Sequence, residues 1–367
     1  MAWYTREAST KLVLFVVATL VLLLIGVRSP AQESTAVDIY RSPRLKHFEA
    51  PSCDVTVSRI ADPAACQVLK SGRGGWVTLD FMVDTQGKPF EISVSRSTGF
   101  EALDALAMKA IAASTFEPAS VNGNPIESAF TFKYVVWEGP EESVIGGPFI
   151  SRYDALKRAL KKNDRAAADA ALKKMVITNL SEDAMFGMAT YLYAQKWGDQ
   201  SQQLEGLQRA LAHEGNTLSN SGGRIHDLPR FFVDQALQLS MDLQIKLHLY
   251  AEALQTYRRL QGAGLDSATL AQFKTAAAQL EKIRTDNSWY SVAADMPQGT
   301  WSLNLFKRHF RAEVAAGSIS QVKLRCERRY VAFAFDPNLQ YDLAPNSGNC
   351  AIEMLGAPGT RFKLIQY

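Results

Sequence analysis

Apolar and polar side chains alternate with a period of two in three short runs of the first half of the chain. The runs lie at Val77–Val83, Phe90–Val94 and Phe130–Val136. This alternation predicts β-strands that each bury one face. Because the turn-forming segment Asp84–Pro89 separates the first two runs, we expect them to pair as a hairpin.

A helical period replaces the alternation between the second and third runs. Its apolar residues recur at spacings of three and four: Leu103, Leu106, Ala107, Ala110 and Ile111. This stripe predicts an amphipathic helix, and the carboxylates of Glu101 and Asp104 in its first turn suit the positive end of the helix dipole. We therefore expect residues 53–138 to form a small ββαβ domain, a three-stranded sheet with a helix on one face.

A sheet of three strands leaves two edge strands, whose unpaired backbone groups can pair with a further strand. Peptide-binding modules use such an edge for β-augmentation. Charged residues such as Lys133 and Glu138 also fit an ordinary edge that is protected against pairing. The alternation alone leaves both interpretations open.

The order and spacing of the motifs in this block resemble the C-terminal domain of the TonB family. The matching motifs are Gly75-x-Val77-x-Leu79-x-Phe81-x-Val83-Asp84-x-x-Gly87, Ser97-Thr98-Gly99, Leu103-Asp104-x-x-Ala107-x-x-Ala110, Phe116-x-Pro118-Ala119 and Gly123-x-Pro125, before the aromatic run Phe130–Val136. The resemblance implies a periplasmic domain that binds outer-membrane transporters. It also implies inner-membrane motor proteins as partners, which supply energy from the proton gradient.

In the TonB family, the TonB box peptide of the transporter adds as a strand to the last β-strand of the domain. The equivalent strand here is predicted at residues 128–137. The candidate peptide-binding residues are Ser128, Ala129, Phe130, Thr131, Phe132, Lys133, Tyr134, Val135, Val136 and Trp137. In this binding mode main-chain hydrogen bonds give the affinity, and side chains only adjust it.

The N-terminal segment Leu12–Val27 is almost wholly apolar and follows Arg6 and Lys11. As a helix it spans about 24 Å, slightly less than a hydrocarbon core of about 30 Å. The segment is either an uncleaved inner-membrane anchor or a secretory signal peptide that is cleaved after Ala31. The resemblance to TonB favours the anchor, and both interpretations place the later residues in the periplasm.

Two features that serve energy transduction in the TonB family are missing from the chain. Membrane helices of that family typically carry a histidine, and Leu12–Val27 contains none. Only a short linker at residues 32–52 replaces the usual long Pro-rich spacer, which is stiff because it favours polyproline II. The alternative function is therefore a periplasmic scaffold that reuses the TonB fold without energy transduction.

The four cysteines fall into two local pairs, Cys53 with Cys66 and Cys326 with Cys350. Three connectivities are possible, and the nearest-neighbour one is favoured because each pair falls inside one predicted module. An even number of cysteines in an exported chain fits disulfides. A zinc site is the alternative, but the chain has no C-x-x-C motif and its five histidines are scattered. We predict no metal site and no cofactor.

Residues 151–288, which follow a linker at 139–150, are rich in Ala, Leu, Gln and Lys and have apolar positions at helical spacing. Ser181 is the expected N-cap of one helix. The segment Leu249–Tyr257 resembles the second helix of a tetratricopeptide repeat. Paired short helices predict a small solenoid, which either binds peptides in a groove or acts as a spacer.

Alternation returns in residues 289–367 and predicts a compact antiparallel β module. Basic residues are frequent there, so contact with an anionic envelope polymer or lipid is one interpretation. A solvated strand face is the other. The net charge of +3 over 367 residues argues against a dedicated nucleic-acid-binding protein.

Motifs of common enzyme classes are absent: the chain has no P-loop, HExxH or GxSxG sequence. The glycine-rich segment Ser71–Gly75 precedes a strand instead of opening a helix, so it is not a phosphate-binding loop. We predict no catalytic residues, and an envelope enzyme is the least favoured function. The expected fold class is α+β, with a ββαβ domain, an all-α helical-hairpin region and a small antiparallel β module in that order.

Overall fold

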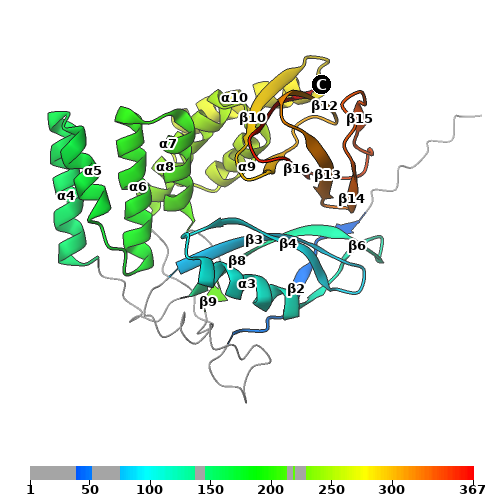
Figure 1. Ribbon diagram of the computed structural model, residues 1–367, viewed down its shortest axis with the longest axis horizontal. Coiled ribbons are helices and arrows are strands. Elements are labelled where there is room, and N and C mark those ends of the chain that lie inside the picture. The colour runs from blue at the N-terminus through cyan, green and yellow to red at the C-terminus, as the bar shows by residue number, and fades with distance from the viewer. Residues whose placement is uncertain (1–38, 52–74, 137–144, 213–217, 220–228) are drawn as a thin grey trace, which may run out of the picture. The chain divides into compact units, whose positions relative to one another are not determined.

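The computed structural model describes residues 39–51, 75–136, 145–212, 218–219 and 229–367 (Figure 1). Several predictions concern residues outside these ranges. They are the membrane anchor or signal peptide at Leu12–Val27, cleavage after Ala31, the pairing of Cys53 with Cys66, and the role of Trp137. Within the described ranges no helix combines the length and apolar character needed to cross a membrane. The mixed α+β class is confirmed.

The predicted strands form a sheet in the order β4–β3–β8–β9. The central strand β3 (Gly75–Val83) pairs antiparallel with β4 (Pro89–Ser97) and with β8 (Ser128–Val136). The fourth strand, β9 (Leu218–Ser219), pairs in parallel with Tyr134 and Val135. The prediction of three strands was therefore wrong, because a two-residue strand from a distant segment leaves no periodic pattern.

Helix α3 (Glu101–Ala113) covers one face of this sheet (Figure 1). All five residues of its predicted apolar stripe are buried. All of them except Ala110 share one core cluster with the inward residues of β3, which are Val77, Leu79, Phe81 and Val83. The hairpin turn requires glycine, since Gly87 has a φ of 82° and a Cβ there would lie 1.9 Å from the Phe116 carbonyl oxygen.

Two small sheets extend the domain. β1 (Tyr40–Arg41) pairs with β6 (Ala119–Val121), which pairs with β7 (Asn124–Ile126). β2 (Arg44–His47) pairs with β5 (Thr115–Glu117). Strands β1 and β2 lie inside the segment predicted as a linker at 32–52. The sequence did not indicate them, because these strands are too short for a readable alternation.

The middle of the chain is helical, and each helix contacts the next along the sequence (Figure 1). The helices are α4 (Gly147–Lys162), α5 (Arg165–Lys173), α6 (Leu180–Trp197), α7 (Gln200–Leu211), α8 (Arg230–Lys246), α9 (Tyr250–Gln261) and α10 (Ser267–Thr285). The similarity to tetratricopeptide repeats stays a prediction.

Two helix starts differ from the sequence-based expectation. Helix α4 begins inside the predicted linker at 139–150, because Pro148 lies in its first turn, where a missing N–H costs nothing. Helix α6 is capped by Asn179 and not by Ser181, since the Asn179 side chain accepts a hydrogen bond of 2.8 Å from the Glu182 N–H. Both residues are good N-caps, so sequence could not choose between them.

The C-terminal β module (residues 290–366) consists of two four-stranded antiparallel sheets, ordered β10–β17–β12–β15 and β11–β16–β13–β14. The strands are β10 (Tyr290–Met296), β11 (Thr300–Asn304), β12 (His309–Ala316), β13 (Ile319–Cys326), β14 (Arg329–Ala334), β15 (Tyr341–Asp342), β16 (Cys350–Gly356) and β17 (Thr360–Gln366). Val322, Ile352 and Leu364 are fully buried in its core. A disulfide joins Cys326 to Cys350, its register partner on β16.

Candidate functional site

Strand β8 contains the described part of the predicted peptide-binding strand. Its inner edge pairs with β3 along the whole length from Ser128 to Val136, without a register shift. Only the outer edge is therefore available to a further strand. The uninterrupted ladder keeps this edge straight, which is the geometry that strand addition needs.

Parts of the same protein lie at both ends of that outer edge. At the C-terminal end, β9 pairs with Tyr134 and Val135, and the Lys133 ammonium donates to the Ala212 carbonyl oxygen. At the other end, the Tyr40 hydroxyl lies 3.0 Å from the Ser128 hydroxyl and donates to the Glu327 carbonyl oxygen, also at 3.0 Å. A peptide that pairs with all of β8 would have to displace β9.

The opposite edge of the sheet is irregular. Glu91 on β4 has a φ of 51°, and the register between β3 and β4 shifts at two places. Bulges of this kind twist an edge and make it a poor template for another strand. Of the two outer strands that pair directly with β3, β8 is therefore the better site for strand addition.

The β module contacts the hairpin through an ion-pair network. The Lys323 ammonium lies 2.6 Å from the Glu91 carboxylate, and Arg325 donates to the Ser93 hydroxyl at 3.0 Å. Arg325 also pairs with Glu353 at 2.7 Å. These contacts connect residues that are 232 positions apart in sequence, so only the tertiary structure brings them together.

Acidification is expected to weaken this contact. The hydrogen bond from Lys323 holds the pKa of Glu91 below its ordinary value of 4.5. The unfolded chain therefore binds the proton more readily, so the stabilisation is present above about pH 4.5 and is lost as pH falls through the lowered pKa. We expect Glu91→Gln to reduce the urea midpoint at about pH 7, and to have a smaller effect at about pH 3. A difference in urea midpoint between Glu91→Gln and the unmodified protein that grows on acidification would contradict this. The control is Glu117→Gln, because Glu117 is exposed.

A buried carboxylate joins the sheet to the helices. Asp183 on α6 is 1% exposed and accepts a hydrogen bond of 2.8 Å from the Trp76 indole N–H of β3. The Arg209 Nε on α7 donates to the same carboxylate at 2.9 Å. Because a buried charge needs such partners, this group ties three elements together.

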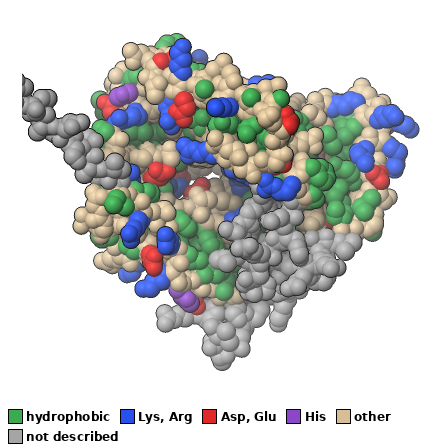
Figure 2. Space-filling model, turned by 180° about the vertical axis from the view of Figure 1, so that it is seen from behind, with side chains coloured by type: hydrophobic (Ala, Val, Ile, Leu, Met, Phe, Trp, Pro, Cys, Tyr) green, Lys and Arg blue, Asp and Glu red, His purple; other side chains and the backbone are tan. Residues whose placement is uncertain are grey.

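A cavity of about 1400 Å³ lies between the sheet, helix α9, the end of α10 and the β module. Figure 2 shows a hollow on the rear face, with Lys and Arg side chains beside it. The polar face of the sheet, opposite α3, forms one wall through residues such as Thr78, Asp80 and Thr131. Sequence analysis missed this cavity, because its walls come from distant segments and no local pattern marks them.

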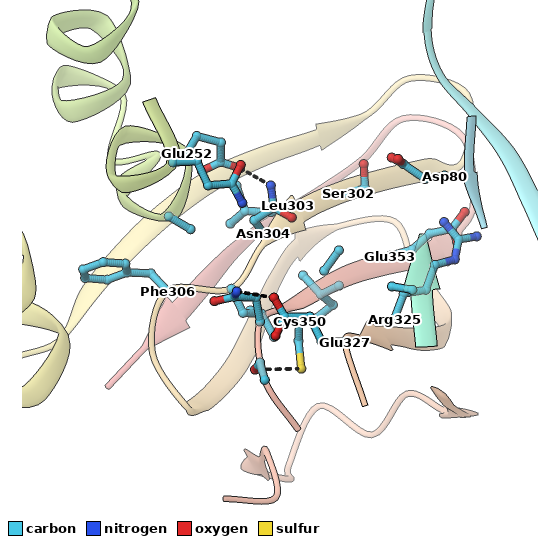
Figure 3. Close-up of a pocket in the computed structure, with 18 of the residues that line it drawn as sticks. Asp80, Glu252, Ser302, Leu303, Asn304, Phe306, Arg325, Glu327, Cys350 and Glu353 are labelled. Atoms are coloured by element: carbon cyan, nitrogen blue, oxygen red, sulfur yellow. Dashed lines mark hydrogen bonds and ion pairs between the residues drawn. The ribbon is translucent and has the colours of Figure 1, made fainter. Parts of the chain in front are cut away.

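The lining residues drawn in Figure 3 include Glu252 of α9, with its hydrogen bond to Asn304 of β11. They also include Asp80, whose carboxylate accepts a hydrogen bond of 2.7 Å from the Thr131 hydroxyl. Burial raises the pKa of Glu252. The cavity thus carries several ionisable groups among apolar side chains.

Comparison with known proteins bears on the sheet domain. The family described as Gram-negative bacterial TonB protein C-terminal matches residues 67–136. No curated protein matches the chain, and no solved structure does. The match contains β3, β4, α3 and all of β8, the elements whose motifs carry the resemblance seen in the sequence. Residues 67–136 therefore match the TonB C-terminal family.

Proposed function

We propose that this protein is a TonB-like envelope protein that binds an outer-membrane transporter by β-strand addition at the outer edge of β8. One observation carries the proposal: within a TonB C-terminal domain, β8 forms an unbroken ladder of nine residues with β3, and of the two strands that pair with β3 it is the more regular. Backbone groups of β8 would hold the TonB box peptide, and side chains such as Thr131 would adjust the affinity.

Further parts of the proposal concern the rest of the cell envelope. Leu12–Val27 would anchor the protein in the inner membrane, with the later residues in the periplasm. Motor proteins of the inner membrane would supply energy from the proton gradient. The protein would have no catalytic activity of its own.

Hydrogen exchange on the full-length protein tests strand addition. The probe is a synthetic TonB box peptide from a transporter of the same bacterium. Strand addition forms new backbone hydrogen bonds at β8, so the amides of residues 128–136 should gain protection while those of β4 do not. Protection that appears on β4 instead, or no change at saturating peptide, would contradict the proposal.

Opening the β9 pairing is expected to raise peptide affinity. Proline at position 218 removes a backbone donor and disfavours strand pairing. A net hydrogen bond is worth on the order of 1 kcal/mol, so Leu218→Pro should tighten TonB box binding by about fivefold. The measurement is a titration by fluorescence anisotropy, and Ser219→Ala, which keeps the backbone donor, is the control. Unchanged affinity of the proline variant would show that β9 does not compete with the peptide.

The occupied ends of β8 favour a second candidate, a periplasmic scaffold that uses the TonB fold without energy transduction. Mass spectrometry of the mature N-terminus separates the two. An intact start at Met1 in the membrane fraction supports the transducer. A start at Gln32 in the soluble fraction removes any direct link to inner-membrane motors and leaves the scaffold.

A further inference from the structure

The large cavity has features of a ligand site that strand addition does not use. Protein interiors are close-packed and hold few voids larger than a water molecule. A cavity of about 1400 Å³ exceeds the roughly 300–1,000 Å³ of a typical small-molecule site. Its walls carry hydroxyl and charged groups beside apolar side chains such as Phe130 and Trp301, so a ligand with both polar and apolar parts would fit.

Most cations at the cavity are already held by partners within the protein. Lys307 pairs with Asp286 at 3.1 Å, Arg284 pairs with Glu281 at 2.6 Å, and Arg325 pairs with Glu353. Arg96 of β4 and Arg258 of α9 also line the cavity. In the part of the chain that the structure describes, neither of these two guanidinium groups forms a hydrogen bond or an ion pair. Both remain accessible to solvent.

The carboxylate of Glu252 has a buried oxygen atom that lacks a hydrogen-bond donor among the described residues. Its Oε1 accepts a hydrogen bond of 3.0 Å from Asn304, whereas its Oε2 is buried and has no hydrogen-bond partner among the described residues. A buried acceptor without a donor is unfavourable, and more so when it is charged. A ligand that brings a donor to this oxygen would recover that cost.

The two kinds of group lie near one another. Arg96 interacts electrostatically with both Glu252 and Asp80, which places a guanidinium and two carboxylates around the same part of the cavity. Guanidinium binds carboxylate through paired hydrogen bonds, and a carboxylate binds an ammonium group. A short peptide presents both groups, an ammonium at its N-terminus and a carboxylate at its C-terminus.

From this arrangement we propose that the cavity binds a short zwitterionic peptide. Arg96 receives its carboxylate, Glu252 and Asp80 receive its ammonium group, and Arg258 provides a second anion contact. The remaining volume accommodates the other residues of the peptide. This site differs from the outer edge of β8, so its failure would leave the proposal of transporter binding unaffected.

Isothermal titration of the full-length protein with trialanine tests the site. The comparison ligands are N-acetyl-trialanine, which lacks the ammonium group, and trialanine amide, which lacks the carboxylate. Each blocked peptide should bind at least about tenfold more weakly than trialanine, since a charge-assisted hydrogen bond contributes about 1.5–3 kcal/mol. Absence of binding by trialanine, or equal affinity of all three peptides, would overturn the proposal.

Two variants assign the groups. Glu252→Gln should lose the preference for trialanine over its N-acetyl form and keep the preference over the amide. Arg96→Gln should show the reverse pattern. Arg158→Gln, on α4 and away from the cavity lining, is the control and should keep both preferences. A general loss of affinity with both preferences retained would mean that these residues only support the fold, and would contradict the assignment.

Discussion

Replacing Asp183 with alanine is expected to lower the free energy of unfolding by about 3 kcal/mol. The carboxylate is 1% exposed and accepts hydrogen bonds from Trp76 and Arg209. Its removal takes away the acceptor of the buried Trp76 indole N–H and the counter-charge of the partly buried Arg209 guanidinium. Urea unfolding followed by circular dichroism measures the loss.

Two further variants make this prediction specific. Trp76→Phe removes the indole donor and part of the ring but keeps the Asp183 carboxylate. It should cost less than Asp183→Ala, on the order of 1 kcal/mol plus the lost packing. Asp154→Ala breaks an exposed pair with Lys157 on α4 and should leave the midpoint unchanged. If Asp183→Ala were as stable as Asp154→Ala, the link between β3 and the helices would contribute nothing to stability.

The second large effect is expected from the disulfide of the β module. Cys326 and Cys350 are 24 positions apart, and closing a loop of this length stabilises a protein by about 3 kcal/mol. The double variant Cys326→Ser/Cys350→Ser should therefore have a free energy of unfolding lower by that amount, and its urea midpoint should fall accordingly. Tryptophan fluorescence reports the change through Trp289 and Trp301, which lie in or beside the module.

The double serine variant is more informative than a reductant, because a reductant would also act on the predicted bridge between Cys53 and Cys66. The control is Cys53→Ser/Cys66→Ser, in which the bridge of the module is kept. An unchanged midpoint of the Cys326→Ser/Cys350→Ser variant would show that the ladder between β13 and β16 holds the module without the covalent bond.

Local patterns account for what could be predicted about the fold. The stripe of Leu103, Leu106 and Ile111 is buried as expected, because helical spacing alone puts these residues on one face. The alternation in β3 gave the correct inward residues for the same reason. The strands β1, β2 and β9 were missed, since two to four residues are too few to show a period.

The candidate site was predictable only in part. The motifs of the TonB C-terminal family located β8 and its expected role as the peptide-binding strand. Two neighbours of β8 could not be foreseen. Strand β9 pairs with β8 just after Lys133, and Tyr40 bridges Ser128 to Glu327. These contacts depend on how the chain returns to the sheet, which no local pattern encodes.

The sequence by itself carried the motifs that match the TonB C-terminal family in residues 67–136. It also determined the inward faces of β3 and α3, because side-chain periodicity and turn residues act between near neighbours. The tertiary structure alone decided three things: the neighbours of the β8 edge, the pairing of Glu91 with Lys323, and the cavity at Arg96 and Glu252. Each of these joins residues from segments far apart in the chain, and their proximity is set by the packing of whole elements.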